Sequence, residues 1–250
     1  ILLFIKSPAD SIWVNFIVGF TQILGSLFLL VVLIQKHGLI FIKVPIQNLV
    51  QYAKQNMYLT GNNLSVQLQQ SIFLFSVSAM GNPVLLGAYS LCDKVVWSFR
   101  MLIISFFNAI YPRAAILHQN NPEDWKLLKQ KLQKLLWVLL CLAALILLFF
   151  ANPIVHIITG KSDELAAFFI QSICLMPLVA GLNSLNVTEL LLRNQYKYIF
   201  NIALILLTIS ILFAGLFIQW GNPRLFGFFP ILVELCSIPL YLYFIKSGRN

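Results

Sequence analysis

The sequence predicts an all-α fold, a polytopic transmembrane helix bundle of about seven spans. Of its 250 residues, 60% are hydrophobic and 10% are charged, whereas soluble domains carry about 25% charged residues. The apolar runs are continuous and rich in leucine, and they do not alternate as the strands of a membrane barrel do. Together these observations exclude a soluble globule, a disordered chain and a small disulfide scaffold.

Uncharged windows of the sequence locate the individual spans. We expect spans at residues 11–35, about 63–80, about 85–112, 135–160, 165–188, 198–223 and about 225–245. The second and third spans are separated at Gly81, Asn82 and Pro83 because this combination stops a helix. Pro177 predicts a kink in the fifth span.

Two of the loops read as amphipathic. Pro45 suits a first helical position, and the apolar face of residues 46–53 is expected to lie on the membrane surface. Asn121 and Pro122 predict the start of a second helix. In that helix we expect one face to contact lipid, namely Trp125, Leu128, Leu132 and Leu135.

Lysine and arginine residues concentrate in alternate loops, at residues 36–54, 113–134, 193–197 and 246–249. By the positive-inside rule these loops and the C-terminus are expected to be cytoplasmic. The net charge of +9 therefore reflects topology and interaction with membrane lipids, and we expect no nucleic-acid partner. The chain begins without Met, and we interpret it as a fragment of a longer protein.

The sequence predicts neither a cofactor nor a metal site. Its cysteines stand alone in apolar stretches, without a CxxC pair or a histidine at ligand spacing. They are Cys92, Cys141, Cys174 and Cys236. The sequence also lacks an HExxH motif, a glycine-rich phosphate loop and a Ser/His/Asp order, so we do not expect an enzyme.

Charged residues inside the third span are the strongest functional signal. Each charge near the bilayer centre costs about 2.5 to 3.5 kcal/mol on insertion scales. Asp93 and Arg100 lie on nearly one helical face with Trp97 between them, while Lys94 points about 100 degrees away. Two interpretations remain open: an ion pair that locks helices together, or a cationic wall for an anionic substrate.

The second span carries a polar stripe made of Asn63, Gln67, Gln70, Ser71 and Ser78. Such a stripe is typical of a helix beside a hydrated cavity, although Gln and Ser also join helices through hydrogen bonds. In the last span, Glu234 lies between Pro230 and Pro239. A carboxylate at that depth is either a structural acid or a group that couples ion movement to conformational change.

Two motifs give a family resemblance. The stretch from Gly87 to Lys94, GAYSLCDK, is followed by Tyr111, Pro112 and Arg113. This spacing resembles the polysaccharide biosynthesis protein family, the O-antigen and exopolysaccharide flippases of the multidrug/oligosaccharidyl-lipid/polysaccharide exporter superfamily. There a G-x-Y-x-x-A-x-K pattern opens a span of the second lobe and Y-P-R closes it. Cys92 replaces the small Ala of that pattern.

The resemblance implies a flippase that moves a polyprenyl-diphosphate-linked oligosaccharide across the bacterial cytoplasmic (inner) membrane by alternating access. The resemblance also implies that transport is coupled to protons or sodium ions. It further implies partners in the same pathway, namely a polysaccharide polymerase and glycosyltransferases. Residues 1–62 would hold the last span of the first lobe and a cytoplasmic linker, and residues 63–250 the six-helix C-terminal lobe. The upstream spans of the family pattern would then lie outside this sequence.

The resemblance also assigns roles within the expected cavity. Arg100 and Lys94 would bind the diphosphate, and Asp93 or Glu234 would couple ions. The glycan would contact Asn63, Gln67, Gln70, Ser71 and Trp97. Two other functions stay open. A multidrug or organic-cation antiporter would favour acids and aromatic residues with few cations, and a membrane polysaccharide polymerase or ligase would favour a large outer loop with arginines.

Overall fold

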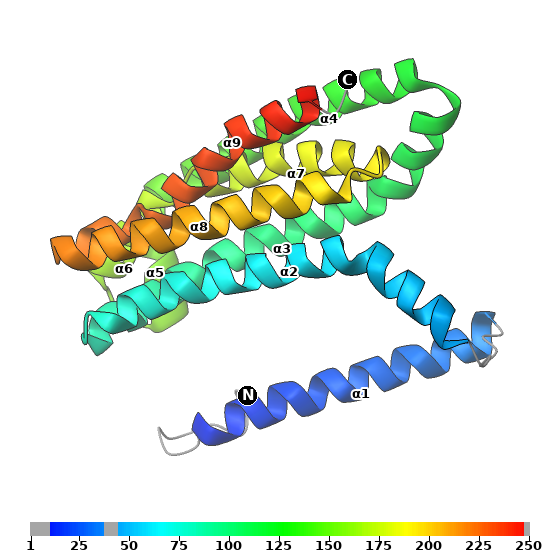
Figure 1. Ribbon diagram of the computed structural model, residues 1–250. Coiled ribbons are helices and arrows are strands. Elements are labelled where there is room, and N and C mark those ends of the chain that lie inside the picture. The colour runs from blue at the N-terminus through cyan, green and yellow to red at the C-terminus, as the bar shows by residue number, and fades with distance from the viewer. Residues whose placement is uncertain (1–10, 38–44, 248–250) are drawn as a thin grey trace. The chain divides into compact units, whose positions relative to one another are not determined.

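The computed structural model describes residues 11–37 and 45–247 (Figure 1). Over these residues the chain is helical, without a strand, which confirms the predicted all-α fold. The elements are α1 (Ser11–His37), α2 (Ile46–Ala79), α3 (Pro83–Asn120), α4 (Pro122–Phe149), α5 (Ala151–Thr159), α6 (Glu164–Ser172), α7 (Met176–Leu192), α8 (Tyr196–Trp220), the 3₁₀ helix η2 (Pro223–Gly227) and α9 (Phe229–Ser247).

The chain divides into two compact units, and the boundary between them in the sequence falls between Tyr52 and Ala53. The first unit contains α1, whose large apolar side chains, among them Phe16 and Phe28, are exposed as expected for a helix that meets lipid. The second unit contains most of α2 and all later helices. The domain boundary expected between residues 62 and 63 lies inside α2 and stays a prediction.

Within the described residues, six helical stretches are long and apolar enough to cross a membrane, so the chain is a multi-pass membrane protein. They are Gly19–Lys36, Pro83–Asn120, Pro122–Phe149, Glu164–Leu192, Tyr196–Trp220 and Phe229–Ser247. The predicted span at 63–80 is not among them. It belongs to α2, which is long enough at 34 residues but too polar, because amides interrupt its apolar face.

Several helix boundaries differ from those expected. Pro45 precedes one continuous helix, α2, so the expected surface segment and the second span are not separate. The predicted break at Gly81, Asn82 and Pro83 separates α2 from α3. Asn82 caps the start of α3, since its Oδ1 accepts hydrogen bonds from the backbone N–H groups of Val84 and Leu85 at 3.0 and 3.2 Å. The third span does not end at Pro112. The helix continues through it to Asn120, although the proline removes one backbone hydrogen bond.

Within the second unit, α7 packs against α3, α4, α8 and α9, and Figure 1 shows it enclosed by these helices. The expected fifth span is broken, since α6 ends at Ser172 and α7 begins at Met176 with Pro177 in its first turn. The expected fourth span is likewise divided at Phe150, between α4 and α5. These breaks let short helices cover one end of the bundle.

That end of the unit is filled by aromatic side chains. Phe229 is fully buried, with its ring centroid 4.6 Å from that of Phe73 and 5.4 Å from that of Phe217. Tyr89 of α3 packs edge to face on Phe169 of α6, with centroids 5.7 Å apart. Edge-to-face packing of this kind fills space densely. The bundle is therefore closed where α5, α6 and η2 meet.

This packing predicts the effect of truncating Phe229. Replacing it with alanine leaves a cavity among Phe73, Phe217 and the neighbouring helices, and we expect the free energy of unfolding to fall by about 3 to 5 kcal/mol. The measurement is unfolding in mixed detergent micelles. Phe75→Ala is the control, because Phe75 is 73% exposed and its removal should change the same quantity by only about 0.5 kcal/mol. Equal losses for both variants would contradict a structural role for the buried Phe229 ring.

Candidate functional site

A cavity of about 650 Å³ opens among α2, α3, α7, α8 and α9. It lies in the half of the second unit away from the aromatic core, and its wall combines apolar side chains, among them Ile103, Phe107 and Leu206, with many polar ones. The amides that line it are Asn62, Asn63, Gln69, Asn108 and Asn183, and the hydroxyls are those of Tyr111, Ser184, Thr188, Tyr196, Ser237 and Tyr241. Polar groups inside an apolar bundle need partners or water, so this cavity is the candidate site.

The two charged side chains of the cavity wall form an ion pair. Arg100 of α3 donates from Nη2 to Oε2 of Glu234 of α9 at 2.8 Å. Both side chains are largely withdrawn from solvent, at 18% and 13% exposed. The pair brings together residues that the sequence separates by 134 positions. Because the opposite charges lie in contact, the cavity wall is close to neutral overall.

A third helix joins this pair. The amide Nδ2 of Asn183 on α7 donates to Oε1 of Glu234 at 3.2 Å and also to the hydroxyl of Ser237. Ser237 in turn donates to the backbone carbonyl of Glu234 at 2.5 Å. The carboxylate is thus held on both oxygens, by α3 on one side and by α7 on the other.

Two buried polar atoms beside the ion pair have no hydrogen-bond partner in the described part of the chain. They are Nε of Arg100, a donor, and Oδ1 of Asn183, an acceptor. Asn183 is only 5% exposed, so its side-chain oxygen has little access to hydrogen bonds from bulk water. An unsatisfied buried polar group costs about 1 to 3 kcal/mol. The site therefore has hydrogen-bonding capacity that its own side chains do not use.

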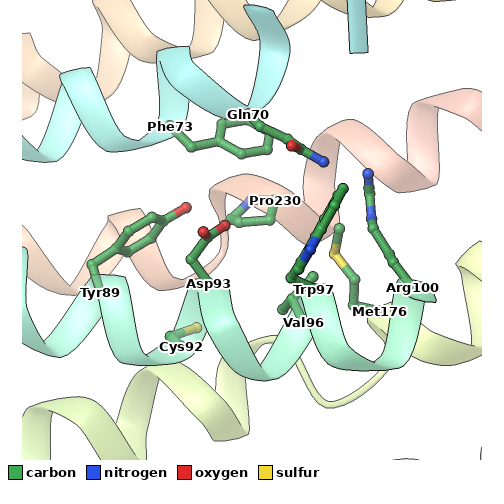
Figure 2. Close-up of a pocket in the computed structure, with 10 residues that line it drawn as sticks. All are labelled: Gln70, Phe73, Tyr89, Cys92, Asp93, Val96, Trp97, Arg100, Met176 and Pro230. Carbon is green, nitrogen blue, oxygen red and sulfur yellow. The ribbon is translucent and has the colours of Figure 1, made fainter. Parts of the chain in front are cut away.

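A narrow crevice lies on the other side of Arg100 (Figure 2). Figure 2 shows Asp93, Trp97 and Arg100 along α3, with the amide of Gln70 reaching towards them from α2. This confirms that Asp93, Trp97 and Arg100 share a face of the helix. The crevice measures about 20 Å³, enough for one water molecule. Arg100 thus stands between this crevice and the large cavity, since it lines both.

The structure brings only part of the predicted site together. Asn63, Arg100 and Glu234 line the large cavity, and Asp93, Gln70 and Trp97 line the crevice next to it. Lys94 is exposed in a separate hollow with Ser90 and Ser98, so the two cations expected to share a diphosphate line no common cavity among the described residues. Gln67 is exposed, and Ser71 donates to its backbone carbonyl at 3.0 Å. Their predicted contact with a glycan remains a prediction.

Several cavity residues were missed by the sequence analysis. The predicted polar stripe comprised Asn63, Gln67, Gln70, Ser71 and Ser78. Of these only Asn63 lines the cavity, together with Asn62 and Gln69 of the same helix. The spacing of Asn62 and Gln69, two helical turns, was the available signal. Asn108 and Ser237 gave no comparable signal, because a single Asn or Ser in an apolar helix commonly bonds within its own backbone.

A second polar cluster centres on Glu189 of α7, which is only 7% exposed. Its carboxylate accepts hydrogen bonds from Trp125 Nε1 at 3.1 Å and Lys129 Nζ at 3.2 Å, both on α4, and forms an ion pair with Arg193. Arg193 also donates to the backbone carbonyl of Ile245 in α9 at 3.4 Å. This Glu189 cluster ties three helices together.

The Glu189 cluster corrects the expected orientation of α4. Trp125 was expected to face lipid, but it is 4% exposed and points to α7. The physical reason is its indole N–H, which needs an acceptor that lipid cannot supply. Leu132 packs against the buried cluster of Leu136 and Leu140, and Leu128 is half-buried. Of the leucines expected to face lipid, only Leu135 is exposed.

No known family model, curated protein or solved structure matches this chain. The resemblance to polysaccharide flippases therefore remains an expectation based on the two motifs. Within residues 11–37 and 45–247 there is also no group of three His, Cys, Asp or Glu side chains arranged to hold a metal ion.

The Glu189 cluster generates a stability prediction. Glu189→Gln leaves Lys129 and Arg193 without their carboxylate, and we expect the free energy of unfolding in mixed micelles to fall by about 1 to 3 kcal/mol. Glu123→Gln removes an exposed carboxylate from the first turn of α4, and should cost less than about 1 kcal/mol. If the two variants were equally stable, the Glu189 cluster would have no structural role.

Proposed function

We propose that this protein transports a lipid-linked oligosaccharide, with a polyprenyl diphosphate carrier, across a membrane by alternating access. The observation that carries the proposal is the cavity of about 650 Å³, lined by amides and hydroxyls inside a bundle of membrane-spanning helices. A bundle that only had to be stable would fill this volume with apolar side chains. A volume of this size, whose wall offers many hydrogen-bonding groups among apolar side chains, suits a cargo with a hydrophilic head group.

The lining suits a glycan. Sugar hydroxyls both donate and accept hydrogen bonds, and an Asn or Gln side chain offers both a carbonyl oxygen and an N–H₂ group. Tyr111, Tyr196 and Tyr241 add aromatic faces with a polar edge. The outer surface of the helices is apolar, with many exposed Leu, Ile and Phe side chains. In this proposal the polyprenyl tail stays against that surface while the head group enters the cavity.

Arg100 is the candidate for the phosphate groups of the carrier. A guanidinium forms paired hydrogen bonds with phosphate oxygens and remains charged in an apolar environment. Arg100 lines the cavity, and its Nε has no partner in the described part of the protein. Lys94, in its separate hollow, would act at another stage of the transport cycle or on another surface of the cargo.

Alternating access requires a site that is closed on one side at a time. The aromatic packing around Phe229 closes the bundle at the α5, α6 and η2 end. The cavity lies in the half that carries the basic loops, which the positive-inside rule assigns to the cytoplasm. We therefore place the cavity on the cytoplasmic side of a bacterial inner membrane. There, glycosyltransferases would supply the lipid-linked sugar, and a polymerase would act on it after transport.

The second candidate is an organic-cation antiporter, which the tyrosines and Glu234 in the cavity wall would favour. A cation site needs an acid that is free to attract its ligand. Glu234 is instead in contact with Arg100 at 2.8 Å, so the wall offers no net negative charge. Transport of a neutral or anionic polar head group agrees better with this arrangement.

The test is transport of a fluorescent lipid-linked oligosaccharide in proteoliposomes that contain the purified protein. Asn108→Leu removes a cavity amide, and we expect the transport rate to fall about threefold to tenfold, the equivalent of one lost hydrogen bond. Thr208→Leu is the matched control, because Thr208 is an exposed side chain of α8 outside the cavity lining, and it should leave the rate unchanged. A rate no higher than that of empty liposomes for the unsubstituted protein would reject the proposed function.

A further inference from the structure

The ion pair in the cavity poses a specific problem for an anionic cargo. Arg100 is the cation of the cavity wall, and Glu234 already occupies its Nη2. A phosphate that approached the guanidinium would come close to this carboxylate. Two negative charges in a poorly hydrated site repel each other strongly. Binding therefore requires the carboxylate to move away or to lose its charge.

We infer that Glu234 competes with the anionic group of the cargo for Arg100, and that a proton taken up by Glu234 favours the exchange. This inference rests on the proposed function, because it assumes an anionic cargo in the same cavity. In the resting state Glu234 neutralises Arg100. When the anion binds, the carboxylate accepts a proton from the aqueous side of the cavity and becomes a neutral carboxylic acid.

The surroundings of Glu234 suit the neutral form as well as the charged one. Asn183 donates from Nδ2 to Oε1 of the carboxylate at 3.2 Å, while its own Oδ1 has no partner in the described residues. A carboxylic acid has an O–H group to donate and a carboxylate has none. A primary amide offers a donor and an acceptor side by side, the complement of a carboxylic acid. The unpartnered Oδ1 is thus an acceptor for the proton that Glu234 would carry.

The other ionisable groups around the pair are few. Asp93 of α3 lies near enough to Arg100 for an electrostatic interaction, from the crevice side, and Tyr241 of α9 lies near both Arg100 and Glu234. Tyr111 of α3 and Tyr196 of α8 also line the cavity, whereas α2 and α7 present neutral amides and hydroxyls to it. Tyrosines are uncharged between pH 5 and 8. Asp93 is therefore the rival carboxylate that an experiment must separate from Glu234.

The first experiment measures the affinity of the purified protein in nanodiscs for farnesyl diphosphate by calorimetry at a fixed pH. Glu234→Gln keeps the shape of the side chain and removes the competing charge, so we expect binding about tenfold tighter, a typical effect of one close charge pair. Asp93→Asn removes the carboxylate that makes no direct contact with Arg100, and should tighten binding less than about threefold. Equal gains for the two variants, or no gain for Glu234→Gln, would overturn the inference.

The second experiment starts with the unsubstituted protein, so its main result does not depend on a variant folding. Decyl sulfonate keeps its single charge between pH 5 and 8, so any change in its affinity reports on the protein. We expect its affinity to rise as the pH falls, by up to about tenfold per pH unit when one proton is taken up with each anion. Glu234→Gln should remove this dependence. A flat profile for the unsubstituted protein, or one that survives in the variant, contradicts proton uptake by Glu234.

The two experiments also separate this inference from the proposed function. If the protein binds decyl sulfonate with the expected pH dependence but does not bind farnesyl diphosphate, the competition is supported and the lipid carrier is wrong. If it binds farnesyl diphosphate but Glu234→Gln changes nothing, the carrier is supported and the competition is wrong. Failure to bind either anion at pH 5 overturns both.

Discussion

The contact between Arg100 and Glu234 is the constraint around which the second unit is arranged. A single charge within a membrane-spanning bundle costs several kcal/mol, so each of these side chains needs the other. Their contact fixes α3 against α9, and Asn183 adds α7 by donating to the same carboxylate. A cavity remains beside this network, and both polar and apolar side chains line it.

The helices are held together by different kinds of contact at the two ends of the bundle. At one end, the rings of Phe73, Phe217 and Phe229 fill the interior without any hydrogen-bonding requirement. At the other, Glu189 joins α4 and α7 through Trp125 and Lys129. Apolar packing tolerates small shifts between helices, whereas a hydrogen-bonded ion pair has defined geometry. The cavity lies at the second of these ends, where Thr188 and Leu191, on either side of Glu189 in the sequence, belong to its lining.

Much of the fold could be predicted because it depends on local properties of the chain. Continuous apolar runs predict spans, and Gly81, Asn82 and Pro83 predict a break between two helices, since both effects act over a few residues. The shared face of Asp93 and Arg100 also follows from helical spacing alone. The partner of Arg100 could not be predicted in this way, because Glu234 is 134 positions away and only the packing of both α3 and α9 on α7 brings it near. The same reason explains the error at Trp125, whose acceptor lies on another helix.

A neutral cavity has a consequence for transport that a strongly cationic one would not have. A cargo bound by several unpaired cations would be held tightly in one state and released slowly, because affinity differences appear mainly in the dissociation rate. In this cavity Arg100 is already paired with Glu234. The binding free energy of an incoming anion is therefore only the difference between its own ion pair with Arg100 and the pair that it replaces. The neutral amides then supply many weak contacts instead of one strong contact. Such a site distinguishes a polar head group from lipid while still allowing it to leave.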